Sequence, residues 1–488
     1  MAYVTEHLKP RQLWRYFEEI SRIPRASKKE REVLDYLLQF AHDHGLDHRE
    51  DGAGNIVMTR PSHPQFARAP VVVLQSHVDM VCEKNADSSH DFDRDPIILC
   101  VEGDWVKAEG TSLGADNGIG IAAMLSILAD QELQFGKMEF LFTVEEEVGL
   151  NGALALDTKM ISGRIMINLD TEEVGALYMG CAGGRDSDLF VPGKTVSVGR
   201  ELKALRIGVS GLRGGHSGAE IHLGGANAIK LLARVISRLR SVAALRIASI
   251  EGGDKHNAIP REAFAVVTVE ERDLENLDKH FDRYTSELRR ELEANDPSVH
   301  FDLDRVDLPA HVFDEGSSGN IIDTVMVVPH GVLAMSGVVA NLVETSSNLS
   351  SIRTEEESVH IHASHRSSVE SALKGVCDVH TSISRLVGAR IEQDVGYPGW
   401  NPDPASRVLG FAKRGAESVI GRVPDVCAIH AGLECGVIKQ KFEGMDAVSM
   451  GPTIRGAHSP DERVHIGSVN QFWQILIETL RLINIEVS

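Results

Sequence analysis

The sequence predicts an α/β fold that is interrupted by an inserted α+β domain. Strand and helix patterns alternate over roughly the first 185 residues, which favours a sheet covered by helices. The middle of the chain carries strands and helices in two similar groups, and α/β patterns return after a Pro, Gly, Asn and Asp cluster at 396–404. At 488 residues the chain is too long for one hydrophobic core, which supports two domains.

The first part of the chain combines short apolar runs rich in β-branched residues with longer segments whose apolar residues recur at helical spacing. The short runs suit strands that are buried on both faces, whereas the longest apolar segment exceeds a typical strand. These patterns predict helices at 12–22, 28–44 and 119–129, and strands at 71–75, 138–144 and 165–169. We therefore expect a sheet with helices on both of its faces.

The middle of the chain predicts two related α+β units. The first has strands at 205–209, 246–253 and 263–269, a helix at 226–240 and a charged helix that ends near Leu292. The second repeats the theme over 331–390, with apolar runs at 332–340 and 358–364 before a helix around 367–387. A strand at 447–451 and a helix at 468–484 follow the turn-rich cluster.

The simplest arrangement is one α/β domain with a second domain inserted into it. We expect the first domain to comprise residues 1–186 and 397–488, and the insertion to comprise residues 187–396. An insertion of roughly 200 residues lies within the usual size range of a domain.

The composition excludes several classes of partner. The chain has 71 acidic against 50 Lys and Arg residues, a net charge of −21, which argues against nucleic acid or an anionic membrane. No stretch of about 18 apolar residues occurs, and the N-terminal residues are typical of a helix, not of a signal peptide. The six cysteines are scattered without a CxxC pair, which indicates reduced thiols and a cytoplasmic protein.

Side chains with metal-binding chemistry follow the predicted strands. They are His77 and Asp79, Asp116 at a helix start, Glu145 to Glu147, Asp170, and His458 in a later loop. Residues beyond the carboxyl ends of strands in an open α/β sheet converge on one crevice, so these groups are expected to meet. Histidine with carboxylates suits Zn²⁺ and its first-row neighbours, and a carboxylate can bridge two metals about 3.5–4 Å apart.

Each of these residues also has an ordinary structural interpretation. A lone histidine after a strand is commonly a hydrogen-bonded loop residue, Asp116 could cap a helix, and Asp170 with Glu172 and Glu173 could form an acidic turn. The coincidence of so many ligand types at the ends of apolar segments favours a metal site. Competing motifs are weak: a dinucleotide-like GIGIAA at 118–123 lacks a preceding strand, and P-loop, HExxH and GxSxG motifs are absent.

Several motifs resemble those of a known family. SHVDM, GADNGIG, TVEEEVG, NLDTEE and HSPDE resemble the metal-site motifs of the co-catalytic zinc peptidases of the aminoacylase and carboxypeptidase clan. GCAGGRD, GLRGGHSGAEIH, HNAIPREAFA, YPGW, HAGLECG and SMGPTIRGAHSPDE more narrowly resemble the bacterial aminoacyl-histidine dipeptidases (peptidase D, carnosinase-like). The resemblance runs from about residue 10 to the C-terminus and is loosest around 295–350. It implies a zinc-exopeptidase-like catalytic domain, with a mixed sheet, and an inserted α+β lid and dimerisation domain.

The resemblance also implies roles for the candidate residues. Asp116 would bridge two metals, with His77 and Asp170 completing one site and Glu147 and His458 completing the other. Asp79 would orient His77, and Glu146 would be the general base. Because three glutamates are consecutive, the base and the ligand could be either Glu145 and Glu146 or Glu146 and Glu147. Alignment on the following Val-Gly favours Glu146 and Glu147.

Three residues of the insertion match lid positions of the resembled clan. His216 would reach a partner subunit's active site to polarise the scissile carbonyl, and Asn257 and Arg366 would hold the substrate. A guanidinium facing the substrate carboxylate suits bidentate recognition. The alternatives are turn or capping roles for His216 and Asn257 and a surface ion pair for Arg366.

The implied activity is hydrolysis of Xaa-His and related dipeptides by a homodimeric metalloprotease. It would use two Zn²⁺ per subunit, with Co²⁺ or Mn²⁺ able to substitute, and a small peptide as substrate. The alternatives are a tripeptidase, a carboxypeptidase or an N-acyl amino acid hydrolase of the same clan. Another is a peptide-binding protein without activity, which the presence of all five candidate ligands and the base disfavours.

Overall fold

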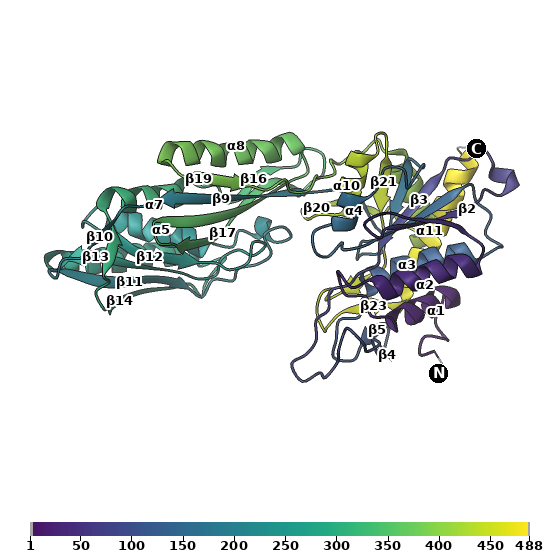
Figure 1. The fold of residues 1–488 in the computed structure, drawn as a ribbon, viewed down its shortest axis with the longest axis horizontal. Helices are drawn as coiled ribbons and strands as arrows, with labels where there is room; N and C mark the ends of the chain where they lie inside the picture. The colour runs from purple at the N-terminus through teal and green to yellow at the C-terminus, as the bar shows by residue number, and fades with distance from the viewer. Residues whose placement is uncertain (1–2, 487–488) are drawn as a thin grey trace. The chain divides into compact units, whose positions relative to one another are not determined.

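A computed structural model describes residues 3–486 of the chain. The chain divides into two units, which are described separately (Figure 1). Unit 1 comprises the residues up to Cys181 and those from Trp400 onward, and unit 2 comprises Ala182–Gly399. The insertion therefore begins and ends a few residues from the boundaries expected at 187 and 396. Within the described residues no helix is both long and apolar enough to cross a bilayer.

Unit 1 is built on an eight-stranded mixed sheet. Its strands, in spatial order, are β1 (Asp47–Glu50), β2 (Ile56–Arg60), β6 (Met138–Thr143), β3 (Val72–His77), β7 (Ile165–Asn168), β21 (Asp446–Ser449), β8 (Ala176–Cys181) and β20 (Asp425–Ile429). The four central strands, β6, β3, β7 and β21, are mutually parallel. Every residue of β3 and β6 is buried, so both faces of the sheet are covered at these strands and buried residues do not alternate with exposed ones.

Helices cover this sheet, and a small second sheet completes unit 1. The helices are α1 (Arg11–Ser21), α2 (Arg31–Asp43), α3 (Ala115–Ala129), α4 (Asn151–Ala155), α9 (Arg407–Ile420), α10 (Glu434–Lys441) and α11 (Ile466–Glu486). Helix α3 packs on β3 and α1 packs on α3, while α9 packs on β21 and α11 on α9. The small sheet, in the order β22 (Ile454–Arg455), β23 (Arg463–His465), β5 (Trp105–Ala108) and β4 (Leu99–Glu102), joins the C-terminal part of the chain to an early segment.

Unit 2 is built on one antiparallel sheet of nine strands. Along the sheet lie β14 (His300–Val306), β11 (Leu202–Ser210), β13 (Ala263–Glu270), β12 (Arg246–Gly252), β17 (Val343–Thr354), β18 (Ser358–Ser367), β9 (Gly183–Pro192) and β19 (Arg390–Gln393), with β16 (Gly331–Met335) also paired to β17. The short strands β10 (Thr195–Ser197) and β15 (His311–Phe313) pair separately. The two α+β groups of the sequence meet where β12 pairs with β17, so their strands form a single sheet.

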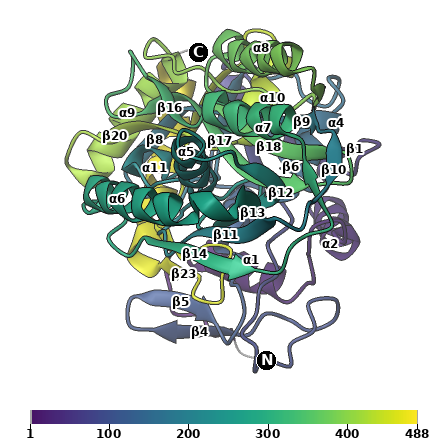
Figure 2. The ribbon, with the colours of Figure 1, turned by 90° about the vertical axis from the view of Figure 1, so that its left-hand side faces the viewer.

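Four helices pack against the sheet of unit 2. They are α5 (Ala228–Leu239), α6 (Leu274–Leu292), α7 (Glu315–Val327) and α8 (Glu370–Val387). Figure 2 shows them in the order α8, α7, α5, α6, which agrees with the contacts that α5 makes to α6 and α7 and that α7 makes to α8. Their apolar faces and alternate residues of the strands form one buried core, in which Leu232, Ile236, Val267 and Ile361 are fully buried.

The differences from the sequence predictions lie mainly in unit 2. Strands β14, β15 and β17 and helix α7 lie within 295–354, where the sequence patterns are faint. Helix α7 contains glycines, serines and β-branched residues, which are weak helix formers. In unit 1, helix α2 begins at Arg31, three residues later than expected, because Lys28 lies in the left-handed region with φ 68°.

Candidate metal centre

The candidate ligands of unit 1 lie at one edge of its sheet. His77 is the last residue of β3 and Asp170 follows β7 closely, while the three consecutive glutamates follow β6. Because these strands are parallel, their carboxyl ends meet at the same edge. Asp116 lies in the first turn of α3, and His458 lies in the loop between β22 and β23.

Asp116 lies between the two histidines. Its Oδ1 is 3.1 Å from His77 Nε2 and its Oδ2 is 3.3 Å from His458 Nε2. Asp170 Oδ1 is 3.2 Å from His77 Nε2, and Glu147 Oε1 is 3.1 Å from His458 Nε2. Two groups of three ligand atoms result, each within 4.8 Å, and they share Asp116.

The three consecutive glutamates have different environments. Glu146 and Glu147 form a third group of possible ligands with His77. Glu145 has a positive φ of 50° and accepts a hydrogen bond from Asn151 Nδ2 at 3.0 Å, on the exposed side of the turn. Of the three, Glu146 and Glu147 are therefore the two that reach the cluster.

Asp79 holds the segment that carries these glutamates. Its Oδ1 accepts a hydrogen bond from Glu146 N at 3.0 Å, and its Oδ2 accepts from Glu147 N at 3.2 Å and from Ser27 Oγ at 2.8 Å. His77 Nδ1 lies 3.1 Å from the backbone oxygen of Asp79 and 3.4 Å from its carboxylate. The carboxylate thus contacts the glutamate segment as well as His77, a contact that the sequence analysis did not predict.

The electrostatics of the cluster favour a cation. Although burial acts to raise it, hydrogen bonds with His458 and His77 lower the pKa of Asp116, and contacts with two carboxylates raise the pKa of His458 to about 11. Burial raises the pKa of Asp170 to about 6 and that of Glu146 well above its usual value. With both imidazoles neutral, as metal ligands must be, the ionised carboxylates would leave an excess of negative charge that a divalent cation would neutralise.

A cavity of about 300 Å³ opens over the cluster. Besides the candidate ligands and Glu146 it is lined by Thr171, Glu172, Tyr178, Ile429, Gly432 and Leu433. The sequence suggests Glu172 only as part of an acidic turn and does not indicate the other five. The sequence signal for Glu172 is that it lies two residues after Asp170. Tyr178 and Ile429 lie on the neighbouring strands β8 and β20, and no sequence motif indicates that they line the cavity.

In unit 2, His216 and Asn257 lie on adjacent segments. The backbone nitrogen of Ser217 donates to Asn257 O at 2.8 Å. His216 Nδ1 accepts hydrogen bonds from the backbone nitrogens of Gly218 and Ala219, at 3.2 and 3.0 Å. A neutral imidazole whose Nδ1 accepts hydrogen bonds carries its proton on Nε2, so His216 Nε2 is a hydrogen-bond donor.

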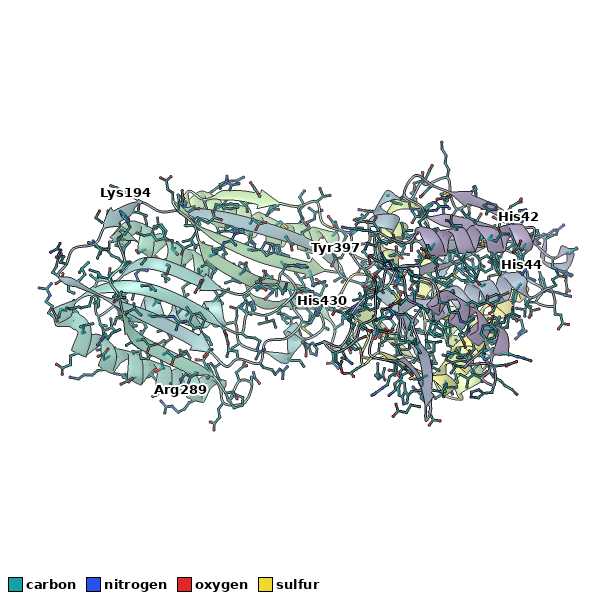
Figure 3. The ribbon with its side chains drawn as sticks, turned by 60° about the horizontal axis from the view of Figure 1, so that its bottom comes forward. His42, His44, Lys194, Arg289, Tyr397 and His430 are labelled. Atoms are coloured by element: carbon teal, nitrogen blue, oxygen red, sulfur yellow. The ribbon has the colours of Figure 1, made fainter. Side chains whose placement is uncertain are left out.

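Arg366 lies on β18 in the same unit and is 9% exposed. Its Nη1 donates to the hydroxyl of Tyr397 at 3.0 Å, and Figure 3 labels Tyr397. Among the described residues it forms no ion pair, and its Nε is buried without a hydrogen-bond partner. The surface ion pair that was the alternative for Arg366 is therefore not formed.

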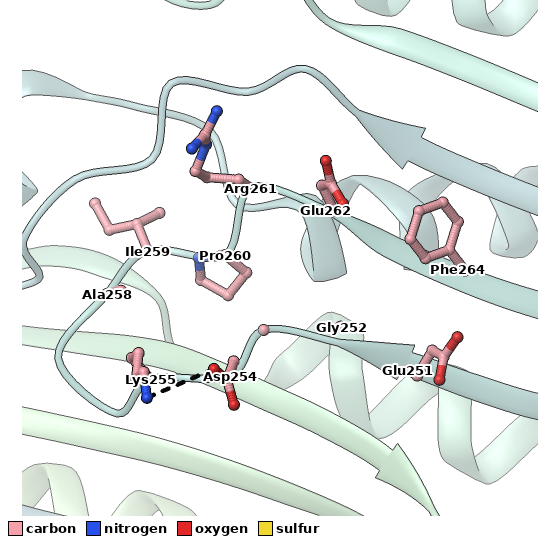
Figure 4. Close-up of a pocket in the computed structure, with 11 residues that line it drawn as sticks. Glu251, Gly252, Asp254, Lys255, Ala258, Ile259, Pro260, Arg261, Glu262 and Phe264 are labelled. Carbon is pink, nitrogen blue, oxygen red and sulfur yellow. Dashed lines mark ion pairs between the residues drawn. The ribbon is translucent and has the colours of Figure 1, made fainter. Parts of the chain in front are cut away.

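Unit 2 also has a cavity of about 580 Å³ at the turn between β12 and β13. Figure 4 shows Arg261, Glu262 and Phe264 on one side and the ion pair of Lys255 with Asp254 (3.7 Å) on the other. None of its lining residues belongs to a group of candidate metal ligands found in the described part of the chain. Within residues 3–486, every group of candidate metal ligands lies in unit 1.

The chain is similar to several known peptidases. A family profile described as a peptidase dimerisation domain of the M20 type matches residues 204–296. The chain is 40% identical to the cytosol non-specific dipeptidase of Escherichia coli over 97% of this chain and 98% of the relative. A crystal structure of an aminoacylhistidine dipeptidase from Vibrio alginolyticus, 39% identical, superposes with a TM-score of 0.91 over 98% of this chain and 97% of that chain. A tripeptidase from Staphylococcus aureus, 18% identical, shares the fold with a TM-score of 0.57 over 98% and 99% of the two chains.

Proposed function

The chain belongs to the aminoacyl-histidine dipeptidases of the M20 peptidase family, and from that membership we propose that it hydrolyses Xaa-His and related dipeptides at a two-zinc centre. The observation that carries the proposal is the pair of ligand groups that share Asp116, since a shared carboxylate is what two adjacent metals need. The relatives from Escherichia coli and Vibrio alginolyticus, at 40% and 39% identity, favour a dipeptidase over the tripeptidases and aminoacylases of the clan.

The residues of the cluster fit a metal pair. Glu147 Oε1 is buried and accepts no hydrogen bond from a described residue, although His458 Nε2 lies 3.1 Å away, so an additional cation would satisfy this oxygen. His77 and Asp170 would hold one metal and Glu147 and His458 the other, with Asp116 between them. The mixture of imidazole and carboxylate suits Zn²⁺, and Co²⁺ or Mn²⁺ would use the same donors. When bound, the metals would supply Lewis acidity to water and to the peptide carbonyl.

Glu146 is the proposed general base. Burial favours its neutral form, which makes the carboxylate a stronger proton acceptor than an exposed glutamate. Its backbone is fixed by Asp79, so its carboxylate has a defined position beside the ligands. Glu146 would take a proton from the attacking water and pass it to the leaving amine, and no covalent intermediate is needed.

The residues of unit 2 are proposed to complete the site. His216 Nε2, as a donor, would stabilise the oxyanion that forms from the scissile carbonyl, and Asn257 and Arg366 would bind the substrate. Arg366 is suited to a carboxylate because its buried guanidinium keeps an unpartnered Nε–H. In line with the dimerisation profile, we propose a homodimer in which His216 acts on the site of the partner, and a cytoplasmic location.

A substrate panel with metal-depleted and metal-loaded protein tests the proposal. We expect hydrolysis of Xaa-His and other dipeptides when Zn²⁺ is added and little hydrolysis of tripeptides or N-acyl amino acids. Preferred cleavage of tripeptides or N-acyl amino acids would favour the alternatives within the clan. Two bound metals without hydrolysis of any panel member would favour a binding protein.

A further inference from the structure

A buried arginine and a buried glutamate contact the backbone of the segments that carry three of the proposed site residues. Arg25 and Glu462 are each 2% exposed. Neither faces the cavity above the cluster, and neither belongs to a group of candidate ligands. Two opposite charges buried beside a metal cluster without contributing a ligand need another explanation.

Glu462 binds the backbone that leads into Asp116. Its Oε2 accepts hydrogen bonds from the backbone nitrogens of Leu113 (2.7 Å) and Gly114 (2.9 Å). Its Oε1 accepts from the backbone nitrogens of Ala115 (2.8 Å) and Asp116 (3.2 Å). One carboxylate thus satisfies four consecutive N–H groups at the start of α3, where the helix dipole also favours negative charge.

Arg25 binds the carbonyl groups of two segments at once. Its Nη1 donates to the backbone oxygens of Val78 (2.9 Å) and Asp79 (3.0 Å), which follow His77, and its Nη2 donates to Gly114 O. The guanidinium therefore links the segment after β3 to the start of α3. Burial lowers the pKa of Arg25, while the charge of Glu462 is the largest influence that opposes this shift.

The glycines of the motif GADNGIG leave room for the guanidinium. Gly114 has φ +69°, and a Cβ there would collide with Arg25 Nη2 and with Met80 Sδ. A Cβ at Gly118 would lie 3.0 Å from the same Nη2 and from the ring of Phe17. The arginine therefore restricts both positions, and backbone conformation also restricts Gly114.

We propose that Arg25 and Glu462 are positioning residues for the metal centre, which together fix the distance between His77 and Asp116. Arg25 holds the carbonyl side of the Gly114 segment and Glu462 its N–H side, so the pair constrains Asp116 relative to β3. Because Asp116 belongs to two groups of candidate ligands, a displacement of its segment would disturb both groups at once. The inference rests on the proposed metal centre. It concerns two residues, Arg25 and Glu462, that are neither proposed metal ligands nor proposed substrate contacts.

The test compares the zinc affinity of variants at Arg25 and Glu462 with that of matched control variants at the far side of the same unit. Arg60 is a partly buried arginine whose guanidinium donates to the carbonyls of Ile127 and Leu133, near the C-terminal end of α3. Glu139 is fully buried and accepts from the backbone nitrogens of Ser162 and Gly163. Arg60→Met and Glu139→Gln thus remove the same kinds of hydrogen bond without touching the metal segments.

Zinc affinity is measured by competition with a chromophoric chelator, and folding by circular dichroism. We expect Arg25→Met and Glu462→Gln to weaken zinc binding about 10–100-fold, and Arg60→Met and Glu139→Gln to change it less than about twofold. Arg25→Lys should lie between, since one ammonium cannot reach both segments as the fork does. The double variant should lose less than the product of the single losses, because both residues fix the same peptide segment.

The outcomes separate the inference from the proposed function. The positioning role would be refuted if folded Arg25→Lys and Glu462→Gln proteins bound zinc with wild-type affinity. An equal loss of zinc affinity in the control variants would refute it as well. If Arg25→Met fails to fold, Arg25→Lys and Glu462→Asp provide the same comparison. Failure of the wild-type protein to bind zinc would instead refute the metal centre, and the inference with it.

Discussion

Unit 2 should lose stability in mild acid because of a buried neutral histidine. His330 lies between α7 and β16, where its Nδ1 accepts hydrogen bonds from Asn227 Nδ2 (3.3 Å) and from Leu349 N (3.4 Å). Burial lowers the pKa of His330 to about 4, and the nearby charge of Lys230 adds to this effect. Protonation of Nδ1 would also break both hydrogen bonds.

The size of the effect follows from linkage. Between pH 6.5 and 4 the unfolded chain protonates this histidine while the folded chain does not. The unfolded state therefore binds more protons, and stability decreases as the pH is lowered. A pKa of about 4 in the folded state against 6.5 in the unfolded state gives a loss of about 2 kcal/mol from pH 7 to pH 5. Burial also lowers the pKa of His365 and His380, so they add a loss of the same sign.

Urea unfolding followed by far-ultraviolet circular dichroism at pH 7, 6 and 5 measures this loss. His330→Gln keeps an oxygen that can accept both hydrogen bonds but does not titrate, so its stability should fall by about 2 kcal/mol less than that of the wild type. His42→Gln replaces a histidine of α2 whose side chain is 82% exposed, and should behave as the wild type does. An unchanged pH dependence in His330→Gln would refute the assigned role of burial.

Three further predictions concern the site. Asp116→Ala should lose both metals together, and two tightly held metals per chain by elemental analysis would contradict its bridging role. Glu146→Gln should lower kcat about 10²–10⁴-fold with metal content unchanged, whereas Glu145→Gln should stay active; the reverse result in steady-state assays would shift the register by one residue. His216→Ala should lower kcat about 10²–10³-fold. When it is mixed with Glu146→Gln under conditions that exchange subunits, about a quarter of wild-type sites should return, since half of the dimers are mixed and each has one intact site. No recovery, with exchange verified, would place His216 in its own chain's site.

Much of unit 1 could be predicted because its central strands are buried on both faces. Strand β3 begins with the apolar run 72–74 and β6 contains the apolar run 140–142, and parallel strands direct whatever follows them to one edge. From the sequence alone, that rule predicts that His77, Asp170 and the glutamates lie close together. The assignment of separate roles to Glu146 and Glu147 depended instead on the family resemblance.

The missed features depend on tertiary contacts that leave no periodic pattern. Strand β17 has a serine-rich sequence whose buried hydroxyl groups bond to other polar groups, as Ser347 Oγ does to His365 Nδ1 (3.0 Å) and to Pro329 O (3.0 Å). Its apolar alternation is therefore weak, and propensity alone does not identify it as a central strand. The contacts of Asp79 and Glu462 with backbone nitrogens likewise join segments that are far apart in the chain.

The strand order of unit 1 has a consequence for synthesis on the ribosome. Strand β21 lies between β7 and β8, so the sheet has a gap at its centre until residues 446–449 have been translated. Unit 2 is continuous in sequence and is complete earlier, which reverses the usual order in which N-terminal domains fold first. Until then β7 and β8 expose unpaired strand edges, which are sites where aggregation can begin.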